Sequence, residues 1–267
     1  MGSLIYLYGF VGADAPEPPD SLRGLAGGRV SLVDAGGVRA VIGRVPAEEY
    51  AAGRIDERLG DLRWVGEQGL AHERVVAWFV DRVTILPAPL LTLYSGESAL
   101  AGAAAERAAE LRTQIQSLEG QREWDLKVTW DPERAQAAAG ELSPEIRALE
   151  ERIAAANPGA AYLLERKRAQ LALEHAAAGC RERAERLLDD VAAHARDTER
   201  LPLPKSGDDG PVLLYAALLV PRDAESALIA AVEERRGDLE RVGMDARLSG
   251  PWAAYRFVGE RREPAGR

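Results

Sequence analysis

The chain has 267 residues, 46% of them hydrophobic and 29% charged, which is enough for one large domain or two ordinary domains with buried cores. Its formal net charge of -9 argues against nucleic acid as a partner, because binding to a phosphate backbone requires a basic face. One cysteine cannot form an internal disulfide and no apolar run approaches the roughly 20 residues that span a bilayer, so we expect a cytoplasmic protein that binds no membrane.

The first part of the chain combines β-like and helical patterns. Its β-like segments are residues 3–11, 29–34, 38–45, 84–94 and 123–131, and its helical segments are 61–82 and 97–118. Ala35-Gly36-Gly37 joins the second and third β-like segments and predicts a hairpin turn. Pro87 and Pro89 remove two hydrogen-bond donors from 84–94, which predicts an edge strand, a bulge or two short strands. This order predicts an antiparallel sheet covered on one face by two helices, and a ferredoxin-like arrangement fits it best.

The middle of the chain is helical. Residues 144–156 and 160–199 carry apolar positions at spacings of three, four and seven, and Asn157-Pro158-Gly159 separates the two segments. This pattern predicts a helical hairpin or a short coiled coil, after which prolines and glycines mark a linker. Beyond the linker we expect a strand, a helix and two short strands, at residues 212–220, 223–236, 245–248 and 254–258.

We therefore predict an α+β protein of two domains. The N-terminal domain, residues 1–135, is expected to hold a ferredoxin-like antiparallel sheet with helices. The C-terminal domain, residues 136–267, is expected to hold a long helical arm (141–200), a linker (201–210) and a small βαββ unit (211–259).

The chain offers few residues for catalysis or metal binding. His72 lacks a second histidine at the spacing of zinc proteases, and His175 and His194 lie roughly 28 Å apart if one helix carries both. We interpret His72 as a helix-surface or helix-packing residue and Cys180 as a small buried hydrophobic residue. The sequence has no nucleophile-elbow serine and no phosphate-binding glycine loop, so we expect neither an enzyme nor a bound cofactor or metal.

Three segments are distinctive in their order and spacing. They are Glu123-Trp124-Asp125-Leu126-Lys127-Val128, the stretch Pro158-Gly159-Ala160-Ala161-Tyr162-Leu163-Leu164 with Arg166 and Arg168, and Gly250-Pro251-Trp252-Ala253-Ala254-Tyr255-Arg256-Phe257-Val258. Together they resemble the gas vesicle protein F/L family over about residues 3–259. The chain departs from the family pattern at Pro87-Ala88-Pro89-Leu90, where proline-methionine-arginine-phenylalanine is usual, and at Ala253-Ala254, where two prolines are usual. These departures leave the F and L branches undistinguished.

The resemblance implies an accessory or minor structural protein of gas vesicles. Members of the family are taken to contact the small hydrophobic major shell protein, together with other accessory proteins, and to aid nucleation or assembly of the shell. The implied fold has an N-terminal ferredoxin-like domain and a C-terminal α+β domain with a coiled-coil element. No cofactor and no catalysis are implied, and the protein would be cytoplasmic and associated with gas vesicles.

Two groups of residues are candidates for partner binding. The first is the terminal motif, with Pro251, Trp252, Tyr255 and Phe257, which is either an aromatic binding patch or a plug that docks the chain's end on the core. The second is Arg166, Lys167 and Arg168, which form either a solvated face or a contact to acidic partner residues. We expect the core of the N-terminal sheet to include Tyr6, Tyr8 and Trp124, and the seat of the long helix on the sheet to include Tyr162, Leu163 and Leu164.

Two other functions stay open. Ferredoxin-like domains often bind small metabolites, so a ligand-binding regulatory protein is the alternative, and a pocket with converging polar groups would support it. An enzyme with a carboxylate or arginine site is the other, and a buried pair of acids in a cleft would support that.

Overall fold

The computed structural model describes residues 2–204 and 210–258, which divide into two compact units. Unit 1 comprises Met1–Glu123 together with Pro251–Arg267, and unit 2 comprises Trp124–Gly250. The division differs from the predicted boundary at residue 135. Strand β6 (Gln121–Trp130) pairs within the sheet of unit 2, and the chain returns to unit 1 after Gly250.

Unit 1 contains an antiparallel sheet of five strands. They are β1 (Ser3–Gly12), β2 (Val30–Asp34), β3 (Val38–Pro46), β4 (Ile85–Pro87) and β5 (Leu93–Tyr94). The order is β2-β3-β1-β4, and β5 also pairs with β1, so the proline-rich segment forms two short strands. Gly36 and Gly37 have positive φ angles of 78° and 89°, which the tight β2–β3 turn requires.

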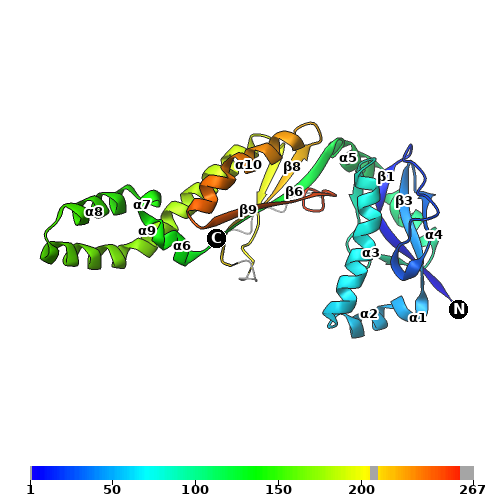
Figure 1. Cartoon of the computed structure of the whole chain (residues 1–267). Coiled ribbons are helices and arrows are strands. Elements are labelled where there is room, and N and C mark those ends of the chain that lie inside the picture. Colours follow the sequence, from blue (N-terminus) through cyan, green and yellow to red (C-terminus); the bar gives the residue numbers. More distant parts are fainter. Residues whose placement is uncertain (1, 205–209, 259–267) are drawn as a thin grey trace. The chain divides into compact units, whose positions relative to one another are not determined.

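Helices cover both faces of this sheet (Figure 1). They are α1 (Ala47–Tyr50), α2 (Ala52–Arg58), α3 (Leu62–Val80), α4 (Glu97–Glu106) and α5 (Ala108–Ser117), with a short 3-10 turn at Leu25–Gly27. Tyr6 and Tyr8 share a core with Val75 and Phe79 of α3. The alternate β1 side chains are buried on the other face, where α5 lies against β1, β3 and β4. The antiparallel α+β fold is thus confirmed. The prediction that two helices cover one face of the sheet is wrong, because α3 and α5 lie on opposite faces. The ferredoxin-like arrangement stays a prediction.

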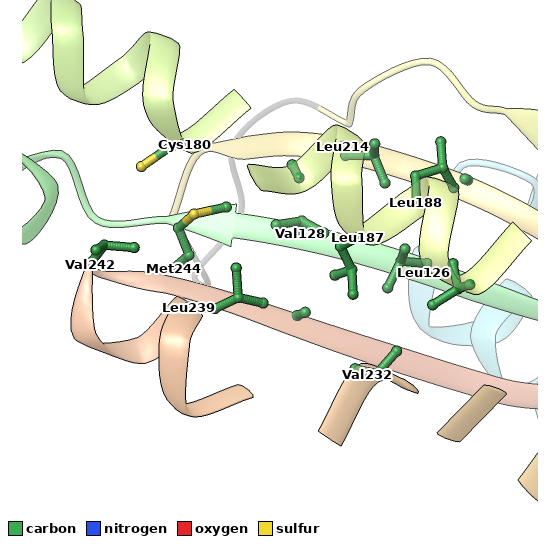
Figure 2. Packing of buried hydrophobic residues seen from close by; sticks show 14 of the residues in the cluster. Leu126, Val128, Cys180, Leu187, Leu188, Leu214, Val232, Leu239, Val242 and Met244 are labelled. Atoms are coloured by element: carbon green, nitrogen blue, oxygen red, sulfur yellow. The ribbon is translucent and has the colours of Figure 1, made fainter. Parts of the chain in front are cut away.

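Unit 2 contains a second sheet and the long helices. Its strands follow the order β7-β8-β6-β9, with β7 (Asp197–Arg200), β8 (Val212–Pro221) and β9 (Met244–Trp252). Its helices are α6 (Pro132–Ala137), α7 (Ala139–Leu142), α8 (Pro144–Ala155), α9 (Pro158–Ala192) and α10 (Glu225–Arg241). Figure 2 shows Leu126 and Val128 of β6 beside Leu187 and Leu188 of α9, and Leu239 of α10 and Met244 of β9 belong to the same core. Trp124 also joins this core, so its predicted place in the N-terminal sheet core is wrong.

Helices α8 and α9 form the predicted hairpin arm (Figure 1). Each begins at a proline behind a capping side chain: Ser143 accepts a bond from the Ile146 N–H, and Asn157 accepts one from the Ala160 N–H at 3.0 Å. No residue from 150 to 171 is buried, although Leu171 packs against the core of unit 2, so the arm beyond Leu171 lies outside that core.

Three boundaries differ from the sequence prediction. Helix α9 ends at Ala192, and Asp197–Arg200 is strand β7 rather than a continuation of the arm. One strand, β9, runs through Gly250 to Trp252, and residues 254–258 form no strand, where two short strands were expected. Gly250 has a positive φ of 145°, which glycine adopts at little cost. Residues 205–209 of the predicted linker lie outside the described residues.

Candidate functional site

The terminal motif lies on unit 1, and we call Pro251–Val258 the C-terminal segment. Ala253 and Ala254 are buried, and Tyr255 packs against the same core as Tyr6 and Tyr8. The Tyr255 hydroxyl donates to Oε2 of Glu73 at 3.1 Å. The Arg256 backbone N–H donates to Oε2 of Glu123 at 2.9 Å, and its guanidinium pairs with the same carboxylate, whose side chain is 1% exposed. These bonds hold the segment against unit 1, as the plug interpretation requires.

A cluster of aromatic side chains lies under the C-terminal segment. The rings of Tyr6 and Tyr8 lie 4.7 Å apart, and His72 contacts both of them and Tyr255. The Tyr6 hydroxyl lies 2.8 Å from Nδ1 of His72 and accepts a bond from the Leu91 N–H at 3.1 Å. His72 is therefore a core residue, which is the helix-packing alternative of the two that the sequence left open.

Burial sets the charge states in this cluster. It lowers the pKa of His72 to about 4, so the imidazole is neutral at pH 7 and the Tyr6 hydroxyl can donate to it. Burial also raises the pKa values of Tyr6, of Tyr8 to about 12, and of Glu73. Burial, together with the nearby Glu73 carboxyl, raises the pKa of Tyr255. Groups with shifted pKa values occur in rigid cores as well as in reactive sites. A cavity large enough for a substrate would distinguish a reactive site from a rigid core.

A depression at the C-terminal segment is small, and none of the four aromatic residues of the cluster lines it. This shallow depression next to Trp252 has room for about 10 Å3, roughly one water molecule. Its lining is Val80, Val83, Thr84, Ile85, Leu118, Gln121, Arg122, Trp252, Ala253 and Ala254. Pockets for metabolites are usually 300 Å3 or more. The depression does not fit a small-molecule substrate.

The structure brings together one constellation that the sequence analysis missed. Oγ of Ser143 lies 3.0 Å from Nδ1 of His175, whose Nε2 lies 3.7 Å from Oε2 of Glu145. These are the residue types of a hydrolase triad. However, Ser143 is 6% exposed and its Oγ caps helix α8, so the geometry favours a bracket that fastens α8 to α9. Sequence spacing gives no signal for it, because Ser143 and His175 are 32 residues apart.

The remaining candidates for chemistry are equally enclosed. Cys180 is fully buried, and burial raises the pKa of its thiol to about 11, which disfavours the nucleophilic thiolate. Across residues 2–204 and 210–258, no group of three or more His, Cys, Asp or Glu residues could hold a metal ion. Over the same residues, no helix has the length and apolar character of a membrane span.

The basic triplet of the arm does not act as one surface. Arg166 and Lys167 are exposed. Arg168 instead reaches across the hairpin to Oε1 of Glu150, with its Nη2 at 2.6 Å and its Nε at 2.7 Å. The sequence thus places three cationic side chains in a row on α9. In the structure Arg166 and Lys167 extend into solvent, whereas Arg168 links α9 to α8.

Large apolar side chains are most exposed at two places. Near the start of α9, Tyr162 is 60% and Leu163 is 65% exposed, so the prediction that they seat the helix on the sheet is wrong. On unit 1, Leu62 and Leu70 of α3 are 84% and 70% exposed, and Leu59 precedes them. At both places the sequence carries apolar residues that lie outside the buried face of their helix, and this pattern could have indicated their exposure.

The chain matches a family model described as "Gas vesicle synthesis protein GvpL/GvpF" over residues 4–259. It is 28% identical to gas vesicle protein L of a Streptomyces strain, over 90% of this chain and 87% of that protein. It is 29% identical to gas vesicle protein L2 of Halobacterium salinarum, over 86% of this chain and 81% of that protein.

Solved structures give the same result for the fold. The crystal structure of GvpF from Anabaena superposes with a TM-score of 0.68 at 20% identity, covering 97% of this chain and 99% of that one. GvpF from Microcystis aeruginosa gives a TM-score of 0.65, also at 20% identity, covering 96% and 99%. The chain therefore belongs to the gas vesicle GvpL/GvpF family.

Proposed function

We propose that this chain is a non-catalytic gas vesicle assembly protein that binds the major hydrophobic shell protein and aids nucleation or formation of the shell. The family gives it a role connected with gas vesicles. The observation that carries the finer proposal is the exposure of large apolar side chains, at Leu62, Leu70, Tyr162 and Leu163, on an otherwise acidic protein. Contiguous exposed apolar side chains usually mark an interaction surface.

The proposed mechanism is masking of apolar surface. A hydrophobic, strand-rich shell subunit aggregates through its apolar faces and unpaired strand edges. Binding to the exposed side chains of this chain would cover one such face. The net charge of -9 would then keep the complex in solution until the subunit joins a growing shell.

Two polar arrangements argue for binding rather than catalysis. The acid Glu73 and the acid Glu123 each hold the C-terminal segment instead of facing a cleft. The Ser143–His175 pair serves a helix cap. The depression beside Trp252 gives no support to the small-ligand alternative, because it holds about one water.

The experiment is co-expression of the chain with the major shell protein, followed by affinity pull-down and by centrifugation of the lysate. We expect the shell protein to be recovered with the chain and to shift toward the soluble fraction at equimolar amounts. A matched culture with an unrelated acidic protein of similar size controls for charge. Equal insolubility of the shell protein in both cultures, with none in the pull-down, contradicts the proposal.

A further inference from the structure

The C-terminal segment covers a buried histidine. His72 is 4% exposed, and its ring contacts Tyr6 and Tyr8 of β1 and Tyr255 of the C-terminal segment. The centroids of the His72 and Tyr255 rings lie 6.4 Å apart. The environment of this one histidine is therefore built partly by the core of the sheet and partly by the last described residues of the chain.

Hydrogen bonding fixes which nitrogen of His72 carries the proton. The Tyr6 hydroxyl accepts a bond from the Leu91 N–H at 3.1 Å and donates its own hydrogen to Nδ1 of His72, 2.8 Å away. Nε2 of His72 then carries the ring hydrogen. Among residues 2–204 and 210–258, this Nε2 is buried without a hydrogen-bond partner. A second proton on the ring would turn Nδ1 into a donor, deprive Tyr6 of its acceptor and bury a charge among aromatic rings.

The elements around His72 are not held equally firmly. Strand β1 lies inside its sheet, paired with β3 on one side and with β4 and β5 on the other. Residues 253–258, by contrast, form neither helix nor strand. Bonds from Tyr255 to Glu73 and from Arg256 to Glu123, together with the burial of Ala253 and Ala254, hold them on unit 1. The C-terminal segment is therefore the neighbour of His72 that moves at the smallest cost in free energy.

We propose that the C-terminal segment is a pH-sensitive latch: when His72 gains a proton, Pro251–Val258 detach from unit 1 while β1 and α3 stay folded. Detachment removes the Tyr255 ring from His72 and admits water to the imidazolium. The latch is closed when His72 is neutral, because Tyr255 then packs on an uncharged ring. It opens in acid, because only the open form solvates the charge.

The sign and size of the effect follow from the two environments of His72. Burial lowers the pKa of His72 to about 4 in the closed form, whereas a solvated imidazole has a pKa of about 6.5. The closed form therefore has its full advantage above pH 6.5 and loses it as the pH falls toward 4. Between pH 7 and pH 5, the ratio of open to closed molecules should rise about twentyfold through His72.

The other titratable groups around the latch act differently. Tyrosines face the cluster from three elements, and burial raises the pKa of each, so they stay neutral below pH 7: Tyr6, Tyr8, Tyr50 and Tyr255. Burial also raises the pKa of Glu73, so the closed form takes up a proton at Glu73 more readily than the open form does. Acid therefore favours closure through Glu73 and opening through His72. Glu123 is paired with Arg256, and this pair is common to all the variants below.

The test is native-state hydrogen exchange of the full chain at pH 7, 6 and 5, with each rate divided by the intrinsic rate at that pH. The reporters are the amides of Tyr255, Arg256 and Phe257, each of which is hydrogen-bonded. Glu73→Gln removes the opposing carboxyl and keeps an oxygen that accepts from Tyr255, and its matched control adds His72→Gln. From pH 7 to pH 5 the reporters should lose about twentyfold of their protection in Glu73→Gln and less in the wild type. In the double variant the loss should be under twofold.

Urea dependence separates the latch from global unfolding. Opening of the latch exposes little surface, so the reporter amides should exchange at rates that change little at low urea, whereas the rates of β1 amides should rise steeply. Equal protection and equal urea slopes for the reporters and for β1 at every pH would show that the segment detaches only when unit 1 unfolds, which overturns the latch. A twentyfold loss that persists in the double variant would exclude His72 as its cause.

Two further measurements keep the inference testable if the double variant does not fold. In Glu73→Gln alone, opening should begin to rise near pH 6.5 and should take up one proton per event; a rise that begins only below pH 5 contradicts the role of His72. Tyr255→Phe should raise opening at pH 7 about fivefold, because it removes the bond to Glu73. Unchanged protection of Arg256 in that variant would mean that Tyr255 does not hold the segment.

Discussion

His72 shows how one buried side chain ties stability to pH. It is 4% exposed, contacts Tyr6, Tyr8 and Tyr255, and its Nε2 has no hydrogen-bond partner within the described part of the chain. A charged imidazole could not be solvated there, and burial accordingly lowers the pKa of His72 to about 4. Folding therefore competes with protonation as the pH falls.

We predict an acid-sensitive stability that belongs to His72. The unfolded pKa is about 6.5 and the folded pKa is about 4, so this contribution is complete above pH 6.5 and is lost as the pH falls toward 4. Between pH 7 and pH 5 the free energy of unfolding should drop by roughly 2 kcal/mol from this group. Urea unfolding at both pH values measures it. His72→Gln, which keeps an acceptor for Tyr6, should lose that part of the drop, and parallel curves for both proteins would contradict the assignment.

Packing between helices is decided at a few close approaches, of which Gly179 on α9 is one. A Cβ at this position would lie 2.5 Å from the backbone oxygen of Leu142 on α7 and 2.9 Å from its Cβ. Gly237 on α10 also lies within a helix, but a Cβ there would meet nothing within 4 Å. Close packing thus requires glycine at position 179, whereas no packing contact requires it at position 237.

We predict opposite signs for the two alanine substitutions. Gly179→Ala should destabilise the protein by about 1–3 kcal/mol, because neither α7 nor α9 can yield without disturbing the core. Gly237→Ala should stabilise it by about 0.5–1 kcal/mol, since alanine loses less backbone entropy in a helix. Thermal unfolding of the two variants beside the wild type measures both. A stabilising Gly179→Ala would mean that α7 does not approach α9 this closely.

Sequence patterns predicted most elements but not their assembly. Periodicity located α3 and α8, turn glycines located the β2–β3 hairpin, and proline and asparagine located the start of α9, because these signals are local. Strand β7 was missed because its residues, Asp197–Arg200, are polar and short and follow a strong helical pattern without a break. The pairing of β6 with β8 and β9 was missed because register between distant strands leaves no local trace.

The candidate site was predicted less well than the fold. The terminal motif was singled out through the resemblance to the family, yet the sequence could not show that Glu73 and Glu123 hold it. Tyr162 and Leu163 were assigned to the core because they are apolar and lie on a long helix. Only the structure shows that these two residues lie on the part of the arm that extends beyond the core of its sheet.

The molecule as a whole has one discontinuous unit. Unit 1 is completed by Pro251–Val258, through buried Ala253 and Ala254 and through the Arg256–Glu123 pair, whereas unit 2 is a continuous stretch of chain. The two units should therefore respond differently to loss of the C-terminus.

We predict that ending the chain after Trp252 destabilises unit 1 by about 3 kcal/mol or more, because apolar contacts and a buried ion pair are lost together. Hydrogen exchange measured by mass spectrometry should show amides of β1 and α3 exchanging at least about a hundredfold faster, with β8 unchanged. Tyr255→Phe, which removes only the bond to Glu73, should have a smaller effect of about 1 kcal/mol. Equal acceleration in both units would contradict the division.

Because unit 1 is discontinuous in sequence, its two parts are synthesised at different times. The ribosome makes Met1–Glu123 first, but the segment that completes their unit emerges only after the 127 residues Trp124–Gly250. At 5–20 residues per second the nascent N-terminal sheet waits roughly 6–25 s without the cover that Ala253 and Ala254 provide. During that interval the His72 ring lacks the contact with Tyr255 that it makes in the complete fold. The earliest-made half of the protein is thus the last to be finished, and ribosome-bound chaperones would meet it in that state.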